Sequence, residues 1–475
     1  MSKPNGRVGT AINTNRNSGS VRLLGAAPLF AVFYILLILP FFPDDGKGRV
    51  ENILFWPILA VLVMTLVLLN RTEVNSRFFR SVPIVSLIAY LVFALASVTW
   101  AFSPDYAFSR LVLQVLALII VVVPYALPAH GKHAIRGVYL CYVLALAVSA
   151  IYVLTTPPSP IGHPGYFTHK QELGLLAAIG VILASYEVLQ RGWRRLVALL
   201  IIILAFWLVF ESASKSALAF ALIALVASWL ILMVCKRTRL TPAFFVAAVV
   251  VVSMFKSYPI ERLGYRLYND ATLTGRTGIW AFIDSQIARK AWFGWGFHSY
   301  YFVPNSPQNE ASGYVRLMPS SHSGYRELKL ETGRIGYWIF LVFIYSSLHL
   351  LERVRRIDPA RAWLFLSVEL FAVLSNLLDS SWLTLTHFWV LYLIVVADSV
   401  RYTWPGREPV PASIEAVQAV RVGPRPRFAR FVGAALRNGT GARVELKHRR
   451  SVTICRTPPC QLLGLGILQD GDLRQ

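Results

Sequence analysis

The segment SSHSGYRELKLETGRIG at 320–336 carries the residues best suited to chemistry. If it is helical from His322, then His322, Arg326 and Lys329 fall at i, i+4 and i+7 and share one face. The cationic form of a histidine is disfavoured at a helix N-terminus, so the neutral ring could accept a proton. The two cations behind it could hold a phosphate. The alternative is that His322 only caps the helix and the cations form a solvated face.

The acidic residues of this segment do not form a catalytic pair. Glu327 and Glu331 share one side of the expected helix, and we expect both to be solvated. His322 is therefore the predicted base that takes, or at least orients, the proton of an acceptor hydroxyl. A positioned base of this kind contributes on the order of 10²–10⁴ in rate.

Three further cations, Lys170, Lys215 and Arg276, adjoin expected membrane boundaries. A diphosphate leaving group can depart without a metal when fixed cations neutralise its developing charge. Taken singly, each cation could equally be an anchor that reaches toward lipid phosphate. Their joint placement with His322 favours a binding site for a diphosphate.

The element expected to present Arg276 is an amphipathic helix within TGRTGIWAFIDSQIARKAWFGWG. Ile279, Ile283 and Ile287 recur at i, i+4 and i+8. Its tryptophans suit a bilayer interface, so the helix is expected to lie flat on the membrane surface. Arg276 stands just before the helix, at the end where backbone N–H groups favour an anion.

The rest of the chain places these segments in a membrane. Of its 475 residues, 56% are hydrophobic and only 15% are charged, which excludes a soluble enzyme and a disordered chain. The apolar residues form runs near bilayer length. The sequence therefore predicts an all-α polytopic membrane protein with about twelve transmembrane helices and one long periplasmic loop containing short amphipathic helices. The expected spans lie near 25–42, 52–69, 82–99, 110–128, 136–155, 172–189, 196–210, 217–234, 241–256, 335–351, 362–378 and 385–400.

Positive charge sets the expected orientation. Five alternate loops together hold 15 Lys and Arg, whereas the short loops between them hold only Lys47, Arg49, Lys170 and Lys215. Because basic loops stay on the cytoplasmic side, both termini are expected to be cytoplasmic and the loop at 257–334 periplasmic. The excess of basic residues is then explained by topology, and no nucleic-acid partner is expected.

Three regions follow from this pattern. Residues 1–24 form a cytoplasmic segment, residues 25–400 form the transmembrane domain, and residues 401–475 form a basic, mostly disordered cytoplasmic tail with 13 Lys and Arg. The tail is either an arm that binds anionic lipid or a dispensable extension. The four cysteines predict neither a disulfide nor a metal site.

Five segments carry a family resemblance. They are GYFTHKQELG at 165–174, SASKSALA at 212–219, TGRTGIW at 274–280, FGWGFHSY at 293–300 and HSGYRELKLETGRIG at 322–336. In order, spacing and expected side, the chain resembles the O-antigen ligase and polymerase superfamily of bacterial envelope glycosyltransferases, and in particular exopolysaccharide polymerases of the succinoglycan type. The resemblance covers about residues 25–400. The sequence departs from the usual pattern at His322-Ser323, Lys170-Gln171 and Ser214-Lys215, yet each keeps the charge or the ring.

The resemblance implies a metal-independent, cofactor-free glycosyltransferase of the bacterial cell inner membrane. Its substrate would be an undecaprenyl-diphosphate-linked oligosaccharide, and its partners would include the lipid bilayer and chain-length-regulating and export proteins. His322 would activate the acceptor. Arg276, Lys215, Lys170 and Arg326 would bind the donor diphosphate.

Three functions remain open at the level of sequence. A polymerase transfers the growing glycan onto an incoming lipid-linked repeat, and a ligase transfers it to lipid A-core. A transporter of the same lipid would carry paired charges or broken helices at mid-membrane. Apart from Glu369 the expected span centres are apolar, which favours an enzyme. Glu369 itself is expected to be protonated and hydrogen-bonded within the bundle, and Asp379 either orients substrate or caps a loop.

Overall fold

The computed structural model describes residues 17–42, 50–127, 134–255, 275–402, 443–446 and 450–453. The first of two compact units, residues 1–406, is helical throughout its described part. Its α-helices are α1 (Asn17–Leu37), α2 (Val50–Leu69), α3 (Ser76–Phe79), α4 (Val82–Ser97), α5 (Pro104–Val121), α6 (Ala134–Thr155), α7 (Lys170–Val188), α8 (Trp193–Glu211), α9 (Lys215–Arg237), α10 (Pro242–Phe255), α12 (Arg276–Arg289), α13 (Gly324–Ile357), α14 (Pro359–Ser375) and α15 (His387–Arg401).

The fold is that of an all-α polytopic membrane protein. Within the described residues, eight helices are long and apolar enough to cross a membrane. The shorter apolar stretch Leu54–Leu69 adds to them, and α14 and α15 have 17 and 15 residues. The fold class expected from the sequence is therefore confirmed, and the count of twelve spans stays a prediction.

Burial follows position in the bundle. Every residue of α15 is buried, because α1, α5, α13 and α14 surround this helix. On α8, by contrast, large apolar side chains are about two-thirds exposed along one stripe that includes Leu196, Leu200 and Ile203. An apolar stripe of this kind is stable only against lipid, so α8 lies on the lipid-facing surface of the bundle.

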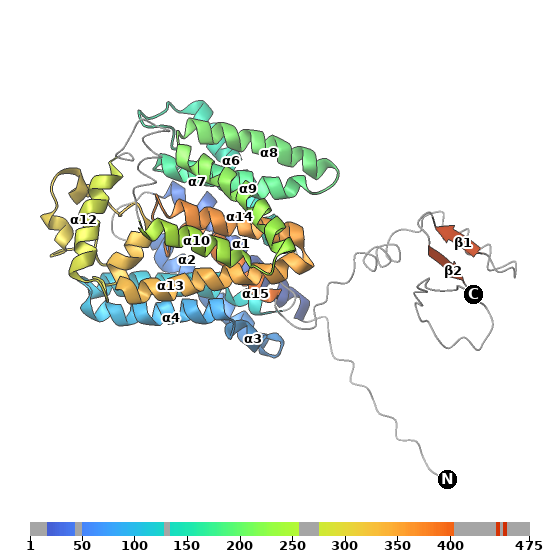
Figure 1. Ribbon diagram of the computed structural model, residues 1–475, viewed down its shortest axis with the longest axis horizontal. Helices are drawn as coiled ribbons and strands as arrows, with labels where there is room; N and C mark the ends of the chain where they lie inside the picture. Colours follow the sequence, from blue (N-terminus) through green and yellow to red (C-terminus); the bar gives the residue numbers. More distant parts are fainter. Residues whose placement is uncertain are drawn as a thin grey trace, which may run out of the picture. The chain divides into compact units, whose positions relative to one another are not determined.

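The long helices run side by side, and α12 lies beyond one end of them (Figure 1). We call this end the loop end. The turn at 293–296 packs there against the kink that divides α13 at Gly333, whose φ of 65° and ψ of −166° are not helical. The backbone N–H of Trp295 donates to Leu330 O at 2.8 Å, and that of Arg334 donates to Ala291 O at 2.9 Å. Backbone hydrogen bonds therefore hold the motifs FGWG and ETGRIG together. The part of α13 that is expected to span the membrane, residues 335–351, follows the kink.

The loop segment around α12 has a small core of its own. Ile279, Ile283, Trp295, Tyr300 and Leu330 pack together. The isoleucine spacing correctly predicts an apolar face on this helix, but that face packs against loop residues and not against the bilayer. The expectation that the tryptophans of this segment face a bilayer is wrong for Trp280 and Trp295. Their side chains are buried, and their indole N–H groups donate to Ser321 O and Gln286 O. The indole rings therefore hold the loop together.

Glu369 is fully buried within the bundle, in agreement with the expected internal hydrogen bond. Its carboxyl accepts from the Ser347 hydroxyl at 3.0 Å, and that hydroxyl also contacts the Tyr392 hydroxyl at 3.1 Å. The other carboxyl oxygen, Oε1, is buried and has no hydrogen-bond partner among the described residues.

The second unit comprises residues 407–475. Its described residues form an antiparallel hairpin of β1 (Arg443–Leu446) and β2 (Arg450–Thr453). The expectation of disorder for the remainder of the tail, and the assignment of residues 1–16, lie outside the described residues.

Candidate active site

A small polar pocket lies at the loop end, where four helices contribute residues from their termini. Its polar lining residues are Gln171 near the start of α7, Ser214 and Ser216 near the start of α9, Arg276 at the start of α12, Ser375 at the end of α14 and Asp379 in the loop after α14. These residues are far apart in the sequence. The fold therefore brings three of the five motif segments to one place.

His322 stands in a turn beside this pocket. The expectation that it begins a helix with Arg326 and Lys329 on the same face is wrong, because α13 begins at Gly324 with Ser323 as its N-cap. His322 instead has a φ of 50°, in the left-handed region that side chains other than glycine rarely adopt. Strained backbone of this kind is concentrated at functional sites.

The hydrogen bonds that hold this turn come from the loop after α14. The N–H of Gly324 donates to Asn376 O at 3.0 Å and to Asp379 O at 2.7 Å, while the N–H of Ser323 donates to the Ser380 hydroxyl at 3.0 Å. A Cβ atom at Gly324 would lie 2.2 Å from Asn376 Oδ1, so this close approach requires glycine. The turn is thus fixed against the loop that carries Asp379.

The surroundings of His322 keep its ring neutral. Burial and the neighbouring Arg276 guanidinium lower the pKa of His322 below its ordinary value of 6.5, and the Asp379 carboxylate opposes them. The Nδ1 atom is buried and has no hydrogen-bond partner among the residues described. A neutral imidazole has one ring nitrogen without a proton and is therefore able to accept one.

Arg276 and Asp379 give the pocket one charge of each sign. Arg276 is the first residue of α12, after Gly275 with a φ of 81°, so it lies where the helix dipole favours an anion. The Asp379 carboxylate accepts from Ser380 N at 2.9 Å and from the Ser381 hydroxyl at 3.3 Å. Asp379 therefore caps its loop and also lines the pocket.

A second, apolar groove of about 480 Å³ adjoins the pocket along α8 and α9. It is lined by Val209, Phe210, Leu218, Ala219 and Leu222, with Lys215 among its lining residues. Ser214 lines both the groove and the polar pocket. Ser214 therefore marks where the apolar groove and the polar pocket adjoin.

Two expected phosphate ligands have other contacts. Lys170 begins α7, and its ammonium donates to Ile161 O at 2.6 Å. The Arg326 guanidinium forms two hydrogen bonds with the Asp284 carboxylate, at 2.9 and 3.2 Å, and stacks on the Trp280 ring. Arg326 therefore faces α12 and does not line the polar pocket.

His169 is a neighbour that the sequence interpretation missed. It caps α7, where its Nδ1 accepts from Gln171 N at 3.2 Å. Burial and the adjacent Lys170 lower its pKa, and Asp379 raises it. His169 is also among the groups that lower the pKa of His322. The available signal was its position in the motif GYFTHKQELG, next to the assigned Lys170.

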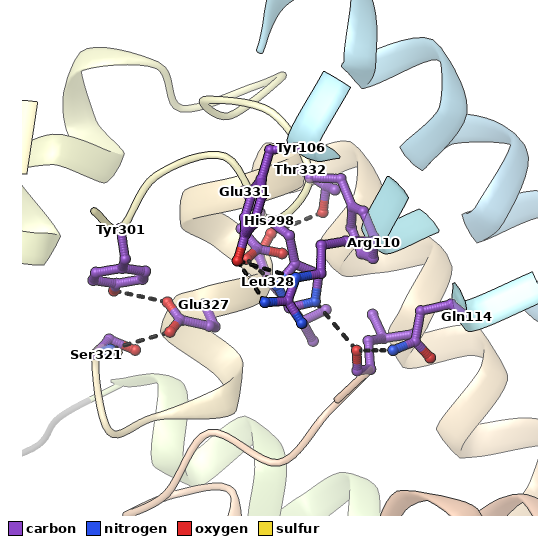
Figure 2. A network of polar contacts seen from close by, with 12 residues as sticks. Tyr106, Arg110, Gln114, His298, Tyr301, Ser321, Glu327, Leu328, Glu331 and Thr332 are labelled. Carbon is purple, nitrogen blue, oxygen red and sulfur yellow. Dashed lines mark hydrogen bonds and ion pairs between the residues drawn. The ribbon is translucent and has the colours of Figure 1, made fainter. Parts of the chain in front are cut away.

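A polar network links the first turns of α13 to Ser321, the residue before His322 in the chain (Figure 2). Its carboxyls belong to Glu327 and Glu331, so the expectation that both are solvated is wrong. Glu331 is only 5% exposed, and its Oε1 lies 3.6 Å from Nδ1 of His298. Both acids lie before the kink of α13, and loss of water raises their pKa values above the usual range. Burial also lowers the pKa of His298 to about 4, so this ring is neutral.

These features define a class: a polytopic α-helical membrane protein with a polar site at one end of its bundle, next to an apolar groove. Residues 199–341 match the protein-family model described as O-antigen ligase. The match covers Lys215, Arg276, His322 and Arg326, and it confirms the resemblance to the O-antigen ligase and polymerase superfamily over that stretch. No curated protein matches the chain. The family supports glycan transfer of the ligase or polymerase type by a membrane glycosyltransferase.

Proposed function

We propose that the protein polymerises undecaprenyl-diphosphate-linked oligosaccharide repeats into an exopolysaccharide at the periplasmic face of the bacterial inner membrane. The observation that carries this proposal is the convergence of Arg276, Asp379 and Ser214 on one pocket beside His322. In this proposal His322 is the base, Arg276 is the cation that stabilises the leaving diphosphate, and Asp379 is the carboxylate that stabilises the protonated ring.

In the proposed reaction, the acceptor hydroxyl oxygen bonds to the anomeric carbon of the donor glycan as the bond from that carbon to the diphosphate oxygen breaks. The hydroxyl proton passes to the neutral ring of His322, and the diphosphate leaves with the bonding electron pair. Arg276 stabilises the departing charge with the N-terminus of α12. Asp379 stabilises the imidazolium that forms.

The donor lipid occupies the apolar groove along α8 and α9 in this proposal. Its isoprenoid chain would contact Leu218 and Leu222, and its diphosphate would lie between Lys215 and Arg276. Ser214, which lines both cavities, marks the point where the chain gives way to the headgroup. Lys170 and Arg326 would then act at the edge of the site, because neither lines the polar pocket or the apolar groove.

The test is elongation of lipid-linked repeats by purified protein in liposomes. His322→Ala and His322→Gln should each abolish polymer while donor binding is retained, because the acceptor then lacks its base. His349→Ala is the matched control, since His349 is an exposed residue on α13. If His322→Ala elongates the repeats at nearly the wild-type rate, the ring only caps the turn and the proposed mechanism is wrong.

A ligase that transfers the glycan to lipid A-core is the second candidate, and the description of the matching family model favours it. Both activities use the same donor, so the acceptor decides between them. Deletion of the protein separates the two. Loss of long polymer with accumulation of single lipid-linked repeats identifies a polymerase, whereas long chains that remain on the carrier identify a ligase.

A further inference from the structure

The carboxyl of Glu327 fastens the turn that carries His322. Its Oε1 accepts from the backbone N–H of Ser321 at 3.1 Å, and its Oε2 accepts from the Tyr301 hydroxyl at 2.8 Å. Figure 2 shows the side chain of Tyr301 and the backbone of Ser321 both directed at this carboxyl. Glu327 therefore joins three segments: the first turns of α13, the loop at 301 and the turn just before the helix.

The backbone conformation of His322 requires hydrogen bonds of this kind to hold it. A left-handed conformation costs a residue with a side chain roughly 1–2 kcal/mol, so a φ of 50° at His322 persists only where neighbouring contacts enforce it. On one side of His322, Ser321 is held through its N–H by Glu327 and through its carbonyl by the Trp280 indole. On the other side, Ser323 is held by Ser380. The ring is thus fixed by contacts on both flanking residues.

The geometry does not make Glu327 a reacting group. Both of its oxygens accept hydrogen bonds from within the loop, and it does not line the polar pocket. The nearby cation Arg326 is paired with Asp284, so Glu327 is not needed as the counter-ion of Arg326. Glu327 is half-buried. Because its carboxyl accepts from two donors of the loop and does not line the pocket, its role is to hold the backbone.

We propose that Glu327 and Tyr301 are positioning residues that hold the ring of His322 in place for the acceptor hydroxyl. The inference rests on the proposed function of His322. It predicts a specific kinetic signature, because a displacement of the base by about 1 Å can reduce turnover by up to about a hundredfold while substrate binding is unchanged.

The experiment compares Glu327→Leu, Glu327→Gln and Tyr301→Phe in purified protein elongating lipid-linked repeats. Glu327→Leu should lower kcat at least about tenfold, with the donor KM unchanged, because the Ser321 N–H loses its acceptor. Glu327→Gln keeps one oxygen for Ser321 and should stay within about threefold of the wild type. Tyr301→Phe removes one hydroxyl, is expected to fold normally, and should lower kcat about threefold.

Glu310→Leu is the matched control, since Glu310 is an exposed acid in the same loop. Near-normal kcat for both Glu327→Leu and Tyr301→Phe would overturn the inference and leave the role of His322 intact. Parallel changes in kcat, KM and thermal midpoint for Leu and Gln alike would also overturn it, since they indicate general damage to the loop. An active His322→Ala, by contrast, would remove the proposed function itself.

Discussion

At the scale of single residues, the charges around His322 set the pH dependence of transfer. The neutral ring is the active form, and its pKa lies below 6.5 because of burial and Arg276. Transfer should therefore be fully present at neutral pH and decline as the pH falls through that lowered pKa. The measurement is kcat against pH for the wild-type protein.

Two variants should shift the pH at which kcat declines, which we call the acidic limb of the profile, in opposite directions. Arg276→Gln removes the cation that lowers the pKa of His322, so the limb shifts to higher pH. Asp379→Asn removes the carboxylate that raises it, so the limb shifts to lower pH. Both variants reduce the rate, and the position of the limb is the readout. Shifts of equal sign would show that another group controls the profile.

Arg276 also tests the proposed contact with diphosphate. Arg276→Ala should raise the donor KM and lower kcat more than Arg276→Lys does. The lysine ammonium keeps the positive charge but cannot form the two parallel hydrogen bonds of a guanidinium to phosphate oxygens. Membrane insertion should be normal in both. Arg316→Ala, in the same loop, serves as the control. Equal, near-normal polymer output from the two Arg276 variants would make this residue an interfacial anchor.

The sequence was informative about which residue types matter and less so about their neighbours. His322, Arg276 and Lys215 follow from motif and charge. In the structure Arg276 lines the pocket, and its guanidinium lowers the pKa of His322. The partial burial of Glu327 and the influence of His169 on the pKa of His322 depend on how distant segments pack. Helical spacing alone placed Glu327 on a solvated face, because it contains no information about the Tyr301 loop.

At the scale of elements, the kink of α13 depends on two glycines. A Cβ atom at Gly333 would lie 2.2 Å from Trp292 O, and one at Gly294 would lie 2.4 Å from Glu331 O. Both residues also have positive φ. Gly333→Ala should therefore destabilise the protein by more than about 2 kcal/mol, measured as thermal unfolding in detergent.

Gly313→Ala separates the two causes of that loss. Gly313 has a φ of 60° but no atom within 4 Å of its expected Cβ. It therefore carries the cost of the left-handed backbone, about 1–2 kcal/mol, without a clash. If the two variants unfold at the same temperature, close packing against the 293–296 turn does not stabilise the kink.

Element positions were predictable where periodicity is strong. The isoleucine spacing identified the apolar face of α12, on which Ile279 and Ile283 are buried. The start of α13 was misplaced by two residues, because hydrogen bonds from the 376–380 loop, and not local propensity, hold His322 in a turn. The tryptophans were placed at a lipid interface because an internal core of loop residues leaves no distinct sequence signal.

At the scale of the whole molecule, the tail should be dispensable for catalysis. Every residue that we assign to the site lies in the unit ending at residue 406, and residues 407–475 form a separate unit. Truncation after about residue 405 should leave polymer synthesis largely intact, measured in cells that express the shortened chain. A truncated protein that inserts normally but makes no polymer would indicate a regulatory or binding role for the tail.

The orientation of the bundle decides whether the site can meet its substrate. The loop segments at 98–103, 290–323 and 376–386 contact one another at the loop end, as the hydrogen bonds of Ser97, Ser299 and His298 show. The 15 basic residues of the alternate loops should then lie at the opposite, cytoplasmic end. The proposal therefore requires the loop end to be periplasmic.

Cysteine labelling tests this orientation in a background where Cys141, Cys235, Cys455 and Cys460 are replaced by serine. Glu310→Cys, at an exposed position of the loop, should react with a membrane-impermeant maleimide in intact spheroplasts. Leu240→Cys, between α9 and α10, should react only after the membrane is opened. The opposite pattern would place His322 and Arg276 in the cytoplasm, away from lipid-linked repeats that have crossed the membrane, and transfer at the periplasmic face would be impossible.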